Sequence, residues 1–100
     1  MNIMLVCNAG MSTGMLAKKM EKFSEGKCTV KAYGIAEYMD HLENVDIILV
    51  GPQIRFQYEE IKDAVANIPV LSIDPIKYGS MNAEAILNTV YDELGGENNE

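Results

Sequence analysis

The chain has 100 residues, of which 48% are hydrophobic and 23% are charged, and its formal net charge is −7. This length and composition predict one soluble globular domain that is large enough to bury a hydrophobic core. The excess of 15 acidic over 8 basic side chains argues against nucleic acid and anionic membrane surfaces as partners, since both are bound mainly through Lys and Arg contacts to phosphate groups.

The first predicted element is a buried strand over residues 2–7, NIMLVC. Its apolar run before Cys7 is too short for a secretory signal, and no Lys or Arg precedes it. No apolar run in the chain approaches the roughly 20 residues of a membrane-spanning helix. We therefore expect a cytoplasmic protein, in which a reducing environment keeps at least one of Cys7 and Cys28 as a free thiol.

Three further segments have the short, β-branched composition of strands, at residues 28–33, 45–50 and 69–73. The segment CTVKAY at 28–33 alternates apolar and polar residues, which is typical of a strand at the edge of a sheet. Cys28 begins this segment and has no Gly-rich loop after it. We interpret Cys28 as a packing residue.

Apolar residues spaced three or four positions apart predict three amphipathic helices, at residues 13–25, 54–68 and 83–94. A weaker pattern predicts a short helix at 35–42, in which the single histidine, His41, is interpreted as a solvated surface residue. In the first helix the predicted buried face is formed by Met15, Leu16, Met20 and Phe23.

Strands that alternate with helices predict a single-domain α/β fold, a three-layer sandwich in which helices cover both faces of a four-stranded parallel sheet. We expect the strand order 2-1-3-4. Ligands of such sheets bind beyond the carboxyl ends of the strands, where the strand order reverses, so the loops at residues 7–14 and 51–56 are expected to face one crevice. The domain is expected to cover residues 1–95, and a disordered acidic tail is expected over 96–100.

The loop after the first strand, C-N-A-G-M-S-T-G at residues 7–14, has the composition of an anion-binding loop. Small residues let the backbone approach a ligand closely, and backbone N–H groups at the start of a helix favour phosphate and the thiolate form of a cysteine. Ser12 or Thr13 can cap the helix or donate a hydroxyl group. Cys7 is therefore a candidate nucleophile and phosphoryl acceptor, although a cysteine that ends a buried strand is also a common core residue.

The low-molecular-weight tyrosine phosphatases use a cysteine in the same setting, in the motif C-x5-R, whose arginine holds the transferred phosphoryl group. Here the sixth position after Cys7 is Thr13, and the chain's single arginine is Arg55. Residues 74–79, DPIKYG, resemble the loop that supplies the general acid in that family, although we interpret Asp74 as the start of a turn. A phosphatase-like or arsenate-reductase-like enzyme is one alternative, and a non-catalytic anion-binding module with an inert Cys7 is another.

The sequence resembles the IIB components of the bacterial sugar phosphotransferase system, of the lactose/cellobiose class. Three segments carry the resemblance: VCNAGMSTGMLAKKM at residues 6–20, VGPQIRFQYEEIK at 50–62 and IDPIKYG at 73–79. Together they extend over nearly the whole chain in the family's order. The resemblance implies the fold of the low-molecular-weight tyrosine phosphatases and a phosphotransferase activity that needs no cofactor and no metal ion.

The resemblance also implies a reaction. Cys7 would accept a phosphoryl group from a phosphohistidine of the IIA component, form a phosphocysteine, and pass the group to a sugar, expected to be a β-linked disaccharide, that the membrane component IIC translocates. The phosphate-binding loop would be formed by Asn8, Ala9, Gly10, Met11, Ser12 and Thr13. A loop without arginine suits a carrier, because a carrier must keep its phosphocysteine from water until the acceptor arrives. Such a phosphoprotein would be cytoplasmic and would dock transiently at the inner face of the membrane.

Residues after the third strand supply further candidates. Gln53 could hydrogen-bond the loop or the phosphate, and Arg55 could approach a phosphate or a partner's carboxylate, although a solvated helix residue is more typical. Met11 and Phe56 suggest a docking surface for IIA and IIC, and the alternative is that both fold into the local core. Tyr78 is a candidate either for supporting the loop or for docking.

Overall fold

The structure is a computed structural model that describes residues 1–8, 11–65 and 67–95. The side chains of Met11 and Ser12 and the expected tail at 96–100 lie outside the described part of the chain. In chain order the elements are β1 (Asn2–Cys7), α1 (Met11–Phe23), β2 (Thr29–Gly34), the 3₁₀ helix η1 (Tyr38–His41), β3 (Ile47–Val50), the 3₁₀ helix η2 (Pro52–Gln57), α2 (Tyr58–Ala64), β4 (Val70–Ser72), α3 (Pro75–Gly79) and α4 (Ala83–Glu93).

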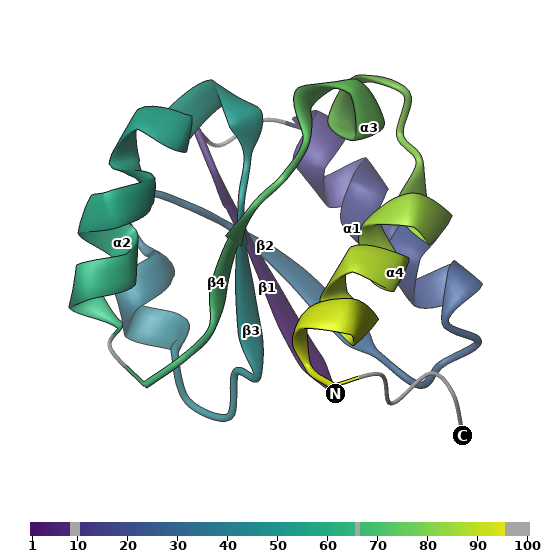
Figure 1. Ribbon diagram of the computed structural model, residues 1–100, viewed down its shortest axis with the longest axis horizontal. Helices are drawn as coiled ribbons and strands as arrows, with labels where there is room; N and C mark the ends of the chain where they lie inside the picture. Colours follow the sequence, from purple (N-terminus) through teal and green to yellow (C-terminus); the bar gives the residue numbers. More distant parts are fainter. Residues whose placement is uncertain (9–10, 66, 96–100) are drawn as a thin grey trace.

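The four strands form one parallel sheet in the order β2-β1-β3-β4, which confirms the predicted order. Helices α1, α3 and α4 lie on one side of the sheet, and α2 lies on the other side with the two 3₁₀ helices (Figure 1). The predicted three-layer α/β sandwich is therefore confirmed. The strand order reverses at β1, which has β2 on one side and β3 on the other.

Each face of the sheet has its own hydrophobic core. Along β1, Ile3 and Leu5 pack with α1 and α4, whereas Met4 and Val6 pack on the opposite face with η2 and α2. All four side chains are at most 2% exposed. A strand that is buried on both faces has a continuous apolar sequence. This is why the sequence predicts β1 and β3.

The helix predicted at residues 54–68 is divided in the structure. Pro52 opens η2, and Ile54 has φ −122° and ψ 26°, which lies outside the helical region, so the regular helix begins only with α2 and ends at Ala64. The predicted apolar face is nevertheless buried, with Ile61 and Val65 at 1% and 5% exposure.

Two other segments also differ from the prediction. Only residues 38–41 of the segment 35–42 are helical, and they form a single 3₁₀ turn. Residues 75–79, interpreted as a turn, form α3 instead. This short helix begins because the Asp74 side chain accepts a hydrogen bond from the backbone N–H of Ile76 (2.8 Å) and Pro75 occupies the first helical turn.

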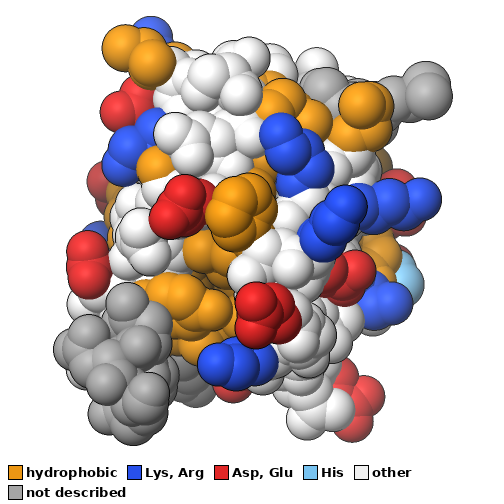
Figure 2. All heavy atoms as spheres, turned by 90° about the vertical axis from the view of Figure 1, so that its right-hand side faces the viewer, with side chains coloured by type: hydrophobic (Ala, Val, Ile, Leu, Met, Phe, Trp, Pro, Cys, Tyr) orange, Lys and Arg blue, Asp and Glu red, His pale blue; other side chains and the backbone are white. Residues whose placement is uncertain are grey.

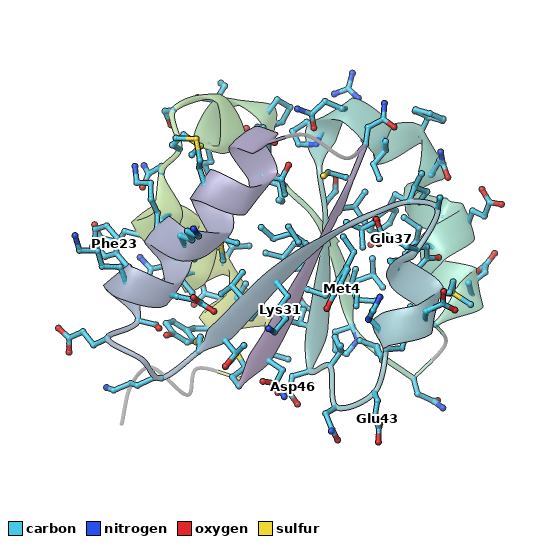
Figure 3. The ribbon with its side chains drawn as sticks, turned by 180° about the vertical axis from the view of Figure 1, so that it is seen from behind. Met4, Phe23, Lys31, Glu37, Glu43 and Asp46 are labelled. Carbon is cyan, nitrogen blue, oxygen red and sulfur yellow. The ribbon has the colours of Figure 1, made fainter. Side chains whose placement is uncertain are left out.

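The buried face of α1 was predicted wrongly in part. Met15 is 59% exposed and Phe23 is 55% exposed, and Phe23 projects from the side of α1 that faces away from the sheet (Figure 3). Two polar residues are buried instead, Thr13 on α1 and Ser24 in the turn after it, at 1% and 5% exposure. The buried residues of α1 and of the turn after it are Thr13, Leu16, Ala17, Met20 and Ser24.

Side chains cover a backbone group at each edge of the sheet. On β2 the backbone N–H of Val30 donates to Glu21 Oε2 (2.8 Å). On β4 the carbonyl of Val70 accepts a hydrogen bond from the Tyr58 hydroxyl (3.1 Å). An unpaired edge strand is a template for pairing with another chain, so these two contacts protect the sheet from edge-to-edge association.

Candidate functional site

Cys7 is the last residue of the central strand β1 and lies at the carboxyl end of the sheet, where the strand order reverses. Its carbonyl accepts a hydrogen bond from the backbone N–H of Ile35 (2.9 Å), immediately after β2. On the other side, the N–H of Gly51 donates to the carbonyl of Val6 (2.8 Å). These ladder contacts fix the backbone of Cys7, and its side chain is buried at 3% exposure.

Gly51 follows β3 and lies close to Cys7. A methyl group added at Gly51 would lie 3.4 Å from Cys7 Cβ and 3.1 Å from Gln53 Oε1, and the second distance is shorter than ordinary van der Waals contact. The absence of a side chain at this position therefore leaves room for the Gln53 carboxamide beside the Gly51 backbone. Gly51 is therefore a residue near Cys7 that the Gly-Pro-Gln segment could have indicated, whereas Gln53 is exposed and its predicted hydrogen bond to the loop or the phosphate stays a prediction.

Helix α1 begins at Met11, four residues after Cys7, so the thiol is followed almost at once by a helix N-terminus. The first N–H groups of a helix have no partner within it, and together with the helix dipole they favour an anion. The first turn of α1 contains no acidic side chain that would compete for this position. Asn8 is exposed, and the predicted loop residues Ala9 and Gly10 lie outside the described residues.

Thr13 occupies the position at which the phosphatase motif has its arginine, and its side chain is hydrogen-bonded. Its hydroxyl lies 2.7 Å from the hydroxyl of Tyr78, within a buried pair in which either group can donate. Thr13 is 1% exposed and Tyr78 is 8% exposed. The contact joins the first turn of α1 to α3, and it brings together two candidate residues that are 65 positions apart in the chain.

Exposed apolar side chains occur on the elements that follow three of the strands. Phe56 on η2 is 78% exposed, Ile76 on α3 is 80% exposed, and Met15 on α1 is 59% exposed. The starts of these three elements lie at the same edge of the sheet (Figure 1). On the face that carries α1, α3 and α4, hydrophobic side chains lie among charged side chains of both signs (Figure 2). The alternative that Phe56 folds into the core is wrong, and Arg55 is also exposed.

Asp74 follows β4 at the same end of the sheet, but its carboxylate caps α3 through the N–H of Ile76. The structure therefore gives Asp74 a role in starting a helix, in place of the turn that was expected. In a phosphatase, the carboxyl group that acts as general acid would instead have to reach the leaving group and protonate it.

Cys28 and His41 take part in other contacts. Cys28 is 4% exposed, and its sulfur lies 3.6 Å from the Tyr91 hydroxyl. This hydrogen bond, together with burial, raises the pKa of Tyr91 to about 12. His41 is exposed and stacks on the ring of Tyr33, with ring centroids 4.1 Å apart.

Within the part of the chain that the structure describes, no three or more His, Cys, Asp or Glu side chains form a group that could hold a metal ion. No helix among the same residues has the length and apolar character needed to cross a membrane.

Comparison with known sequences gives one consistent result. A family model described as the lactose/cellobiose-specific IIB subunit of the phosphotransferase system (PTS) matches residues 2–89. The oligo-β-mannoside-specific EIIB component of Bacillus subtilis is 32% identical over 82 residues, which cover 77% of this chain and 80% of the relative. The galactose-specific EIIB component of Lactococcus lactis subsp. cremoris is 34% identical over 95 residues, which cover 85% and 88% of the two chains.

A longer relative and two solved structures extend the comparison. A lactose-specific EIICB component of Staphylococcus haemolyticus is 33% identical over 64 residues, which are 61% of this chain and 11% of the relative. The cellobiose-specific IIB component of Borrelia burgdorferi superposes with a TM-score of 0.70 at 36% identity, covering 88% of this chain and 85% of that chain. The lactose-specific IIB domain of Streptococcus pneumoniae has the same fold, with a TM-score of 0.78 at 17% identity and coverages of 92% and 95%.

Proposed function

Because the chain belongs to the lactose/cellobiose-specific IIB family of the sugar phosphotransferase system, and is therefore a phosphotransferase component, we propose that Cys7 carries the phosphoryl group. The observation that supports this assignment is the position of the thiol. Cys7 ends the central strand at the switch point of the sheet, immediately before a helix N-terminus that has no acidic residue in its first turn. A transferred phosphoryl group at Cys7 would meet the backbone donors there.

The transfer from IIA is a displacement at phosphorus. The Cys7 thiolate attacks the phosphohistidine of IIA, the N–P bond breaks as the S–P bond forms, and the electron pair of the broken bond returns to the imidazole nitrogen. In the second transfer a sugar hydroxyl attacks the phosphocysteine. The S–P bond then breaks as an O–P bond forms, the thiolate leaves, and the hydroxyl proton passes to a base or to water. Both steps depend mainly on positioning and on stabilising the charge of the phosphoryl oxygens.

The same site is suited to delaying hydrolysis. The loop of residues 7–14 contains no arginine to stabilise the transition state for attack by water, and the carboxylate of Asp74 is engaged in capping α3. These features favour a carrier over a phosphatase.

We propose that IIA and the membrane component IIC dock in turn at the carboxyl edge of the sheet, against the exposed side chains of Met15, Phe56 and Ile76. One relative is named as an EIICB component, which is consistent with a IIC partner for this chain. The IIB relatives of similar identity are named for different sugars, so we assign sugar selection to IIC. The domain of residues 1–95 would act in the cytoplasm and meet IIC at the inner face of the membrane.

Mass spectrometry of the intact protein tests the assignment of Cys7. The protein is incubated with phosphoenolpyruvate, the general phosphotransferase components and a IIA of this class. We expect a single added phosphate on the wild type and on Cys28→Ser, the matched control for the other buried thiol, and no adduct on Cys7→Ser. An adduct that persists in Cys7→Ser would reject the assignment, whereas steady hydrolysis of an aryl phosphate by the wild type would favour the phosphatase alternative.

A further inference from the structure

The hydroxyl groups of Thr13 and Tyr78 form a hydrogen bond that packing alone does not require. Both residues are buried, and valine and phenylalanine would fill the same volumes without a polar group to satisfy. Two buried hydroxyls 2.7 Å apart instead favour one orientation of the two elements, because this hydrogen bond is lost if they move apart.

Tyr78 is itself held in place from the sheet. The backbone N–H of Tyr78 donates to the carbonyl of Asp74 (2.9 Å), and the Asp74 side chain caps the same helix at Ile76. A second contact joins α1 to the turn that follows α3, where Lys19 Nζ donates to the carbonyl of Met81 (3.0 Å). Helix α3 is thus anchored at the end of β4, and it presents the Tyr78 hydroxyl to the first turn of α1.

We propose that Tyr78 is a positioning residue for phosphoryl transfer, which acts through Thr13 on the first turn of α1. This inference rests on the proposed function of Cys7. The backbone N–H groups of that turn are the donors available to the phosphoryl group, and their benefit depends on their being held in the correct direction before transfer. Thr13, at the position of the phosphatase arginine, here connects the first turn of α1 to α3.

Single-turnover transfer from phosphorylated IIA to Cys7, followed at increasing IIA concentration, tests the proposal. For Tyr78→Phe we expect the saturating rate to fall about tenfold, with the half-saturating IIA concentration unchanged within about twofold, because alignment is lost and docking is kept. Tyr91→Phe is the matched control, since it removes a phenol hydroxyl that contacts Cys28 instead, and it should transfer at the wild-type rate. Thr13→Ser should stay within about threefold of the wild type, whereas Thr13→Val should be as slow as Tyr78→Phe.

The double variant Thr13→Val/Tyr78→Phe separates positioning from a merely structural role. It removes both hydroxyls of the pair, so neither is left facing an apolar side chain, and the thermal midpoint should lie above those of the single variants. The saturating rate should nevertheless stay as low as in the single variants. A rate that recovers together with the thermal midpoint, or wild-type transfer by Tyr78→Phe, would overturn the proposal. Failure of the wild type to accept a phosphoryl group would instead reject the proposed function of Cys7.

Discussion

Gly51 packs against Cys7 so closely that a methyl group at Gly51 would lie 3.4 Å from Cys7 Cβ. The same methyl group would lie 3.1 Å from Gln53 Oε1. Gly51, directly after β3, therefore leaves little room beside Cys7 Cβ, and a larger residue at position 51 would also press on the exposed side chain of Gln53.

Substitution Gly51→Ala should displace the Gln53 side chain and disturb Cys7. We expect phosphoryl transfer to Cys7 to slow by about tenfold, since small displacements of reacting groups are costly, while the free energy of unfolding falls by only about 1 kcal/mol. Rapid-quench kinetics and urea unfolding measure the two effects. Gly79→Ala is the control, because a methyl group there meets no atom within 4 Å, and equal transfer rates for the two variants would contradict the prediction.

Asp74 should act as a helix cap and not as a general acid. Replacing it with alanine removes the acceptor for the Ile76 N–H, and the free energy of unfolding should fall by about 1 kcal/mol. Asp74→Asn keeps an acceptor but cannot donate a carboxyl proton, so it should retain both stability and transfer rate. Loss of transfer in Asp74→Asn, with normal stability, would show that the carboxyl group takes part in the chemistry.

The stability of the folded state should depend on pH above pH 10 because of Tyr91. Its hydrogen bond with Cys28 and its burial raise its pKa from 10.0 to about 12, so the folded state favours the neutral phenol. The resulting stabilisation is fully present below pH 10 and is lost as the pH rises toward 12. An absorbance titration of the phenols should show a late step that disappears in Tyr91→Phe. A titration curve that Tyr91→Phe leaves unchanged above pH 11 would contradict this.

Removal of the Glu21 side chain should expose an edge of the sheet. The carboxylate accepts the N–H of Val30 on β2, and Glu21→Ala leaves that donor open to another chain. We expect concentration-dependent self-association by light scattering and a loss of about 1 kcal/mol of stability. Glu25→Ala removes an equal charge from the exposed turn after α1 and should remain as monodisperse as the wild type. Similar association of both variants would indicate a charge effect alone.

Much of the fold could be predicted because its strands are distinctive. The central strands β1 and β3 are buried on both faces, which requires continuous apolar runs. The first run ends at Cys7, so the sequence predicts that Cys7 lies at the carboxyl end of the sheet. The edge strand β2 has the mixed pattern that its position permits. The sequence also indicated Thr13 as an informative position, because the residue type there excludes the phosphatase motif.

Other features depend on contacts between distant residues. Thr13 on α1 and Ser24 in the turn after it are buried, with hydroxyls that are hydrogen-bonded to Tyr78 and to the backbone of Glu21, whereas Met15 is exposed. A pattern of apolar residues therefore assigns part of this face incorrectly. Helix α3 was missed because it is a five-residue helix started by one capping contact, and a helix of that length has too few residues to show a period.

Phosphorus NMR of the phosphorylated protein is the most direct test of phosphorylation at Cys7, because it reports the atom to which the phosphoryl group is bonded. After phosphorylation through IIA, we expect one resonance of an S-phosphorylated cysteine from the wild type. The same resonance should persist in His41→Asn, which removes the single histidine, and should be absent from Cys7→Ser. A phosphohistidine resonance that disappears in His41→Asn, or a phosphorylated species that persists in Cys7→Ser, would contradict the account.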